Sequence, residues 1–227
     1  MKNFRSIFVC SASIFVLGGC SGGGYPAQTG YVTRDTEPGI SQDALILAAG
    51  VSTTPWVQLA TAQQIDAELS EIRAATPALA AIHARGDEDP KSLIFVVKPG
   101  TAWLASWKSG KLATGESGLD DALETYRAKG VSLIGDNIGV VTFDQWMNAK
   151  NLSSALGGLS SSVEKVELNG YIGDGDRILG AKPGVRYEFQ KGWGDCPAGC
   201  TSRHTWTATR SGSGWNVTES GAPLDGG

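Results

Sequence analysis

Leu93-Ile94-Phe95-Val96-Val97 is an unbroken run of apolar residues, most of them β-branched or aromatic, and the turn residues Pro99-Gly100 follow shortly after it. A short run of this kind predicts a buried strand. We expect the segment 102–107 to pair back on this strand as a hairpin, because Pro99-Gly100 favours a turn between them.

Helical and strand-like patterns alternate after this strand. Ser117 is a good N-cap for a helix that carries Leu119 and Leu123 on one stripe and ends near Gly130. The later segments predict two strands, a helix and a last strand, at 131–134, 138–143, 146–159 and 163–168. If the hairpin is set aside, the order is β-α-β-β-α-β, which is that of ferredoxin-like domains. We therefore predict a ferredoxin-like α+β domain over 93–169.

The regions on either side of this domain have different patterns. Residues 41–92 form a helical segment by prediction, because Ile65, Leu69 and Ile72 recur at helical spacing. Residues 170–227 alternate between apolar and polar side chains, as Tyr187 and Phe189 illustrate, which predicts a small antiparallel β-meander. The predicted fold class is thus α+β, with a helical N-terminal part, a ferredoxin-like middle and a β-meander at the C-terminus.

Composition narrows the functional classes. The 227 residues are 41% hydrophobic and carry a net charge of −4, with no concentrated basic patch. A nucleic acid would repel a chain of this sign, so we expect no nucleic-acid partner. No motif in the sequence indicates a cofactor, and we predict none.

The N-terminus has the order of a secretory signal. Lys2 and Arg5 precede a short apolar run, which ends in Leu17-Gly18-Gly19-Cys20. This stretch resembles the signal of bacterial lipoproteins, in which cleavage occurs before the cysteine and its thiol carries lipid. The resemblance implies a signal peptide over 1–19, lipidation (palmitate) of Cys20 and attachment to a membrane. Ser21 resembles the residue found in lipoproteins of the outer membrane, so we expect an exported, lipid-anchored protein of the cell outer membrane, facing the periplasm or the surface. Residues 20–40 are expected to form a flexible tether.

Cys196 and Cys200 remain as an even pair once Cys10 is lost with the signal and Cys20 is lipidated. In an oxidising compartment such a pair predicts a disulfide. A metal site formed by these cysteines and His204 is the weaker interpretation, because the cysteine spacing differs from that of common zinc sites. We therefore predict no metal.

The residues around these cysteines form the densest cluster of chemically special side chains. Gly192-Trp193-Gly194-Asp195-Cys196-Pro197, with Cys200 and Arg203-His204, resembles a GWGDCPxGC…RHxW signature of uncharacterised exported bacterial proteins. The resemblance to that group implies no particular activity. The candidate binding surface consists of Trp193, Asp195, Arg203 and His204. We predict no catalytic residue, although a hydrolase that uses Asp195 and His204 is the alternative hypothesis.

Two stretches of the middle region point to a known family. Gly139-Val140-Val141-Thr142-Phe143 and Val163-Glu164-Lys165-Val166-Glu167-Leu168-Asn169 resemble the end of the inhibitor-type propeptides of subtilisin-like proteases. The resemblance implies a ferredoxin-like fold whose sheet face and following tail contact a protease. Leu168 stands where these propeptides usually have proline. The predicted function is a non-enzymatic binding or interaction module with a protein partner in the envelope, of which protease inhibition is the more specific form.

Overall fold

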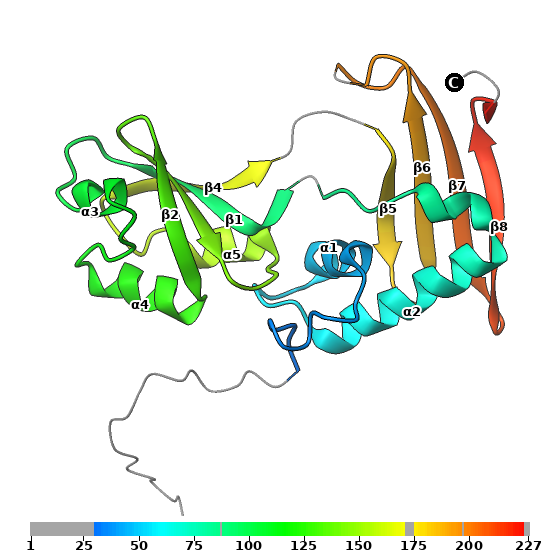
Figure 1. Ribbon diagram of the computed structural model, residues 1–227, viewed down its shortest axis with the longest axis horizontal. Helices are drawn as coiled ribbons and strands as arrows, with labels where there is room; N and C mark the ends of the chain where they lie inside the picture. Colours follow the sequence, from blue (N-terminus) through cyan, green and yellow to red (C-terminus); the bar gives the residue numbers. More distant parts are fainter. Residues whose placement is uncertain (1–29, 87, 171–174, 197, 225–227) are drawn as a thin grey trace, which may run out of the picture.

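The computed structural model describes residues 30–86, 88–170, 175–196 and 198–224. Within these residues the protein is mixed α+β and contains two four-stranded antiparallel sheets, which lie side by side (Figure 1). Helices cover one face of each sheet, and each sheet has its own hydrophobic core. None of the helices in this described part is both long enough and apolar enough to cross a membrane.

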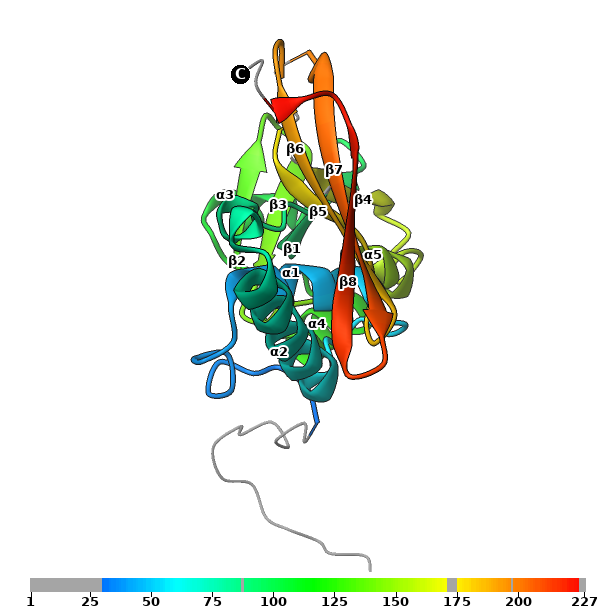
Figure 2. The same cartoon turned by 90° about the vertical axis from the view of Figure 1, so that its right-hand side faces the viewer.

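One of the two units is assembled from the two ends of the described chain, and we call it the split unit (residues 30–86 and 175–224). Its helices are α1 (Gln42–Val51), α2 (Leu59–Ala75) and the 3-10 helix η1 (Pro77–Ala81). Its strands, in their order across the sheet, are β5 (Arg177–Lys182), β6 (Arg186–Trp193), β7 (Ser202–Ser211) and β8 (Gly214–Gly221). Figure 2 shows α2 alongside this sheet.

The core of the split unit follows from the alternation in its strands. Tyr187, Phe189 and Trp206 lie on one face of the sheet and are almost fully buried. The α2 residues Ile65 and Leu69 belong to the same core. The predicted antiparallel meander is present, with β5 as an additional strand. The sequence patterns predict 41–92 and 170–227 as separate parts, whereas a single hydrophobic core contains residues from both.

A buried carboxylate fastens α2 to the sheet. Tyr187 donates a hydrogen bond of 2.6 Å from its hydroxyl to Glu68, and the backbone N–H of Gly184 donates one of 3.0 Å to the same oxygen. Gln64 donates to the other oxygen of Glu68. A buried carboxylate is costly unless it is fully hydrogen-bonded, so these bonds fix how α2 sits on β6.

A second buried carboxylate joins the two helices to the chain that leaves them. Asp43 of α1 accepts hydrogen bonds from the Arg73 guanidinium of α2 and from the backbone N–H of Ala84. The exposed imidazole of His83 lies 3.1 Å from the same carboxylate. Asp43 thereby holds Ala84 in place, and the chain continues from Ala84 into the second unit.

The second unit is inserted into the first, and we call it the inserted unit (residues 88–170). Its strands lie in the order β2-β3-β1-β4, and every neighbouring pair is antiparallel. Its elements, in chain order, are β1 (Glu88–Val97), α3 (Leu104–Lys108), α4 (Ser117–Thr125), β2 (Ala128–Ile134), β3 (Ile138–Phe143), α5 (Ala149–Leu156) and β4 (Val163–Gly170). Leu93, Phe95 and Val97 of β1 are completely buried against all three helices.

The hairpin predicted for 102–107 is wrong, because Leu104–Lys108 forms helix α3. The two tryptophans of this segment explain the difference. Trp103 and Trp107 are four residues apart, so a helix places both on one face, where their ring centroids are 4.8 Å apart. Trp107 also packs edge-on against Phe95 and fills the space beside Gly139, where any side chain would collide with the indole.

Residues 31–40, which the sequence assigns to a flexible tether, are packed against the split unit. Val32 is buried in its core, and its N–H donates to the carbonyl of Val57. Tyr31 forms an antiparallel bridge with Gln58. Ile40 also packs against the core, and Glu37 accepts a hydrogen bond from Lys91. Residues 1–29, which include Cys20 and the predicted signal peptide, lie outside the described residues.

The two units meet where α1 ends and α5 begins. Asn148, the N-cap of α5, donates from its side-chain amide to the carbonyls of Ala49 and Ser52 at the end of α1. Asn151 donates to Ser52 as well. Carbonyls at a helix end lack partners within the helix, and these asparagines satisfy them across the junction. The hydrogen bonds thus lock the orientation of the inserted unit.

The Tyr187–Glu68 bond predicts a stability loss that depends on pH. At pH 7, Tyr187→Phe should lower the free energy of unfolding by about 1–3 kcal/mol, because it removes a donor from a buried carboxylate. Burial, and then the hydrogen bond to Glu68, raises the pKa of Tyr187 above its ordinary value. The raised pKa stabilises the fold below about pH 10, the unfolded-state value, and that contribution is lost as the pH rises further.

Urea unfolding of the wild type and of Tyr187→Phe between neutral and alkaline pH measures both effects. The wild type should lose stability more steeply than Tyr187→Phe above about pH 10. Tyr126→Phe makes the same substitution in the inserted unit and is the variant for comparison. Equal slopes for wild type and Tyr187→Phe would contradict the role of this hydroxyl.

Candidate functional site

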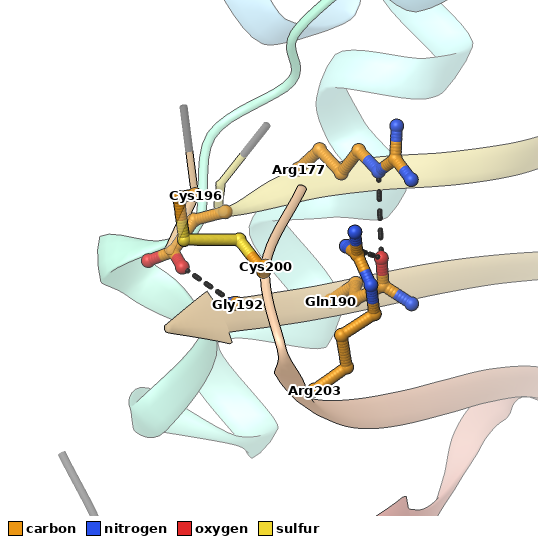
Figure 3. The surroundings of a disulfide bond; sticks show 7 residues. Arg177, Gln190, Gly192, Cys196, Cys200 and Arg203 are labelled. Carbon is orange, nitrogen blue, oxygen red and sulfur yellow. Dashed lines mark hydrogen bonds between the residues drawn. A yellow bond between two sulfur atoms is a disulfide. The ribbon is translucent and has the colours of Figure 1, made fainter. Parts of the chain in front are cut away.

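The cluster singled out by sequence lies in the connection between β6 and β7. The two strands pair up to Trp193 and Ser202, so the residues between them form the loop at one end of the sheet. A disulfide joins Cys196 and Cys200, whose Cα atoms are 3.9 Å apart (Figure 3). The predicted disulfide is therefore present. Pro197 lies outside the described residues.

Backbone hydrogen bonds and glycines shape this disulfide loop. Within it, the N–H of Ala198 donates to the carbonyl of Asp195, and the N–H of Gly199 donates to Cys196. Gly192 packs directly under the bridge, because a Cβ at this position would lie 2.6 Å from the Cys200 sulfur. Gly194 adopts a positive φ of 93°. The glycines on both sides of Trp193 are thus explained by close packing and backbone conformation.

The disulfide excludes the metal interpretation for this cluster, because both sulfurs are bonded to each other. Zinc binds cysteine as the thiolate, which neither residue can supply in this state. Elsewhere in the described part of the chain, no three His, Cys, Asp or Glu side chains are grouped as a metal site would need.

Arg203 contributes to a polar network on the helix-free face of the sheet. Its Nη1 donates to the side-chain carbonyl of Gln190 over 2.8 Å, and Nε of Arg177 donates to the same oxygen over 3.4 Å (Figure 3). The three residues come from β7, β6 and β5. Arg177 lies opposite Gln190, whereas Arg203 lies opposite Gly192 and reaches Gln190 diagonally. Gln190 therefore holds two guanidinium groups close together.

His204 lies on the opposite face of β7 and is a packed residue. Its side chain is buried, and its ring centroid lies 4.3 Å from that of Trp206. Nδ1 donates to the carbonyl of Ala222 over 2.8 Å. Nε2 is 3.3 Å from a carboxylate oxygen of Glu219 but is not aligned for a hydrogen bond. Both nitrogens therefore face groups of the last strand and its C-terminal continuation.

The candidate residues do not converge on one place. Arg203 and His204 are consecutive in a strand, so their side chains point to opposite faces. Asp195 is exposed at the start of the loop, and Trp193 is half-buried at the end of β6, on the face that carries Phe189. These residues are close together in the sequence, but their side chains therefore do not form one site in the structure.

The residues of two other surfaces can be located only in the structure, although the propeptide resemblance implies that a sheet face of this domain is a contact surface. One is the helix-free face of the inserted unit, which carries Ile94, Val96, Ile134, Ile138 and Val140. The continuous apolar run of β1 was interpreted as fully buried, although only its alternate residues face the helices. The number of predicted helices could have revealed this exposed face, because so few helices can cover only one face of a sheet. The other surface is the cleft of about 350 Å³ at the junction of the units, between α1, β5 and the start of α5, which no local motif marks.

Comparisons of this chain with protein-family models, with curated proteins and with solved structures found no match. A function for this chain must therefore be inferred from its own sequence and geometry.

The small disulfide ring predicts a local effect on stability. Replacing both cysteines by serine should lower the free energy of unfolding by about 2 kcal/mol or less, because so short a loop has little chain entropy to lose. Hydrogen exchange should become faster in the disulfide loop and stay unchanged at Phe189 and Trp206. Untreated and dithiothreitol-treated wild type are the matched pair for this measurement. Loss of protection throughout the split unit on reduction would contradict the prediction.

Proposed function

We propose that this chain is an exported lipoprotein, anchored to the outer membrane through Cys20, that presents a non-enzymatic interaction module. The observation that carries the anchor is the stretch Leu17-Gly18-Gly19-Cys20 after a short apolar run. Each acyl CH₂ that enters a bilayer contributes about 0.8 kcal/mol, so several chains on one cysteine hold a protein firmly. The packing of the chain from Tyr31 onward supports a folded module close behind the anchor.

We further propose that the inserted unit is a ferredoxin-like domain. Its strand order β2-β3-β1-β4, its antiparallel pairing and its helices on a single face support this assignment. Its element order also agrees, with α3 and α4 between β1 and β2 and α5 between β3 and β4. A domain of this architecture keeps one sheet face free for a partner.

The helix-free face of this unit has the composition of a protein-binding surface. Ile134 pairs with Ile138, Ile138 with Val96, and Val140 with Ile94, so their side chains form one continuous apolar patch. Ile134 is 58% exposed, and the other four are half-buried. The adjacent strand β4 borders the patch with Lys165 and Glu167, which pair with each other. Apolar centres with polar borders are typical of interfaces.

The resemblance to protease propeptides supplies the more specific partner, a subtilisin-like serine protease. The resembling segments lie in β3 and β4 of this same sheet. The described chain resumes beyond β4 with β5, which belongs to the other sheet. Because β5 is part of the split unit, we propose that the patch itself provides most of the contact.

The alternative hydrolase has less support. A general base needs a nucleophile within hydrogen-bond reach and access to substrate. His204 is buried against Trp206, and its Nδ1 is used by a backbone carbonyl. These contacts favour a structural role for this histidine.

Replacing Cys20 tests the anchor. In a Gram-negative host, Cys20→Ser should block cleavage and lipidation at this position, and mass spectrometry should show an uncleaved chain without lipid. Cys10→Ser is the matched control, because that residue would be removed with the signal, and it should leave a lipidated Cys20 at the mature N-terminus. Cleavage elsewhere, or an unmodified Cys20 in the wild type, would refute the anchor.

The apolar patch is tested by inhibition of a subtilisin-type protease acting on a peptide substrate. Both cores consist of residues between 32 and 217, so a soluble form that starts at Ser21 retains them. We expect this form to inhibit the protease and Ile134→Asp to weaken inhibition about tenfold or more, since it places a charge in an apolar contact. Val185→Asp, which alters a residue 44% exposed in the other unit, should inhibit like the wild type. Full protease activity in a large excess of the wild type would reject the inhibitor role.

A further inference from the structure

The outer edge of β8 lacks the features that protect the other sheet edges. The two sheets of the described chain end in β2, β4, β5 and β8. Proteins protect such edges with bulges, lysines or prolines, because unpaired backbone groups can pair with another chain. The pairings of β2, β4 and β5 each contain a register shift, and these strands carry Lys129, Lys165 and Lys182. In contrast, β8 pairs with β7 without a shift and has neither lysine nor proline.

The pairing with β7 shows which backbone groups of β8 face outward. Arg210 lies opposite Trp215, yet its N–H donates to the carbonyl of Val185, away from β8. This pair is therefore not hydrogen-bonded, and such pairs alternate with hydrogen-bonded pairs along an antiparallel ladder. It follows that the N–H and C=O groups of Trp215, Val217 and Glu219 point away from β7. No residue of the described chain forms a hydrogen bond with these groups.

The described chain leaves the approach to this edge open. Figure 1 shows β8 on the side of the split unit that is farthest from the inserted unit, and in Figure 2 the same strand faces the viewer. Helix α2 contacts β8 from one face of the sheet, where Trp215 donates to Glu71. The exposed neighbours of Glu71 on α2 include Ala67 and Ala74, which are small. A further strand can therefore approach β8 in the plane of the sheet.

The hydrophobic core of the split unit reaches this edge. Trp215 and Val217 are half-buried and pack against that core. A strand added beyond β8 covers more of both side chains, and the burial of apolar surface contributes about 25 cal/mol for each Å².

The sequence of β8 is complementary to itself in one antiparallel register. If Val217 pairs with Val217 of a second copy, the outward-facing groups of both strands meet and can form about six backbone hydrogen bonds. Trp215 then lies opposite Glu219 of the second copy, and Glu219 opposite its Trp215. A β-branched pair lies at the centre, and no two like charges lie opposite each other, which are the conditions that stabilise paired strands.

A second copy also satisfies both open edges at once. Because the pairing is about a two-fold axis, each copy uses the same strand, and the combined sheet ends in β5 on both sides. Each of these ends carries Lys182 and a register shift, which oppose further growth of the sheet. This closure favours a second copy of the chain over an unrelated strand.

We propose that two copies of this chain pair antiparallel through β8, about a two-fold axis at Val217, and join their four-stranded sheets into one. This interface is separate from the apolar patch of the inserted unit and does not depend on the function proposed for that patch.

Light scattering of the soluble form that starts at Ser21, at increasing protein concentration, tests the dimer. We expect the mass to rise from monomer to dimer and no further. Val217→Pro removes an outward-facing N–H and no hydrogen bond to β7, so it should weaken association about tenfold or more. Val217→Thr, the matched control, keeps that N–H and the β-branched shape and should still dimerise.

Hydrogen exchange shows whether Val217→Pro keeps the fold and whether β8 is the interface. The amides of Tyr187 and Phe189 should stay protected in this variant, and in the wild type the amide of Val217 should become protected as the dimer forms. A wild type that stays monomeric, growth beyond the dimer, or wild-type association by Val217→Pro would overturn the proposal. Protection of the Val217 amide in a monomeric sample would indicate another occupant and would also overturn it.

Cysteine cross-linking tests the register. In the proposed dimer, two Val217→Cys chains place their Cα atoms about 5.5 Å apart, which a disulfide can span. The soluble form lacks Cys10 and Cys20, and Cys196 is bonded to Cys200, so the new thiol is the one that air oxidation can cross-link. Ser220→Cys, on the same strand, places its two Cα atoms about 20 Å apart and should stay uncross-linked. Cross-linking through position 220 in place of position 217 would overturn the register.

Discussion

The hydrogen bonds of one buried carboxylate hold the split unit together. Glu68 enters the protein interior on α2, and its partner Tyr187 lies 119 residues further along the chain. Burying a carboxylate costs free energy unless its oxygens accept hydrogen bonds. The helix and the sheet must therefore pack in the one arrangement that brings Glu68 to its donors. The bonds of Glu68 thereby tie α2 to β6 and to the turn before it, across the hydrophobic core that the helix and the sheet share.

Local patterns predicted much of the secondary structure. The strands at 93–97, 138–143 and 163–168 lie within β1, β3 and β4 or match them closely, because short apolar runs bounded by turns are local signals. The shared core of the N-terminal helices and the C-terminal sheet could not be predicted, because no local pattern records which distant face an amphipathic helix covers. Helix α3 was missed because its stability depends on Trp103 packing on Trp107, and on Trp107 packing against Phe95 and Gly139.

The candidate site, too, could be predicted from the sequence only in part. Cys196 and Cys200 were paired correctly, because the choice depended on the chemistry of the compartment and on the number of cysteines left. The residues around them were grouped as one surface because they are close in sequence, yet strand alternation sends Arg203 and His204 to opposite faces. The apolar patch and the cleft arise only when strands and helices from different parts of the chain come together, so neither has a sequence motif.

The insertion of one unit within the other has a consequence for the order of folding. During synthesis the helices α1 and α2 emerge first, but the sheet that buries their apolar faces emerges last. The inserted unit is contiguous in sequence, so it can complete its core while the helices still wait. Contacts between distant residues form slowly, and exposed apolar helices are prone to aggregate in the meantime. A lipid anchor at Cys20 would keep those waiting helices at a membrane surface and away from other unfolded chains.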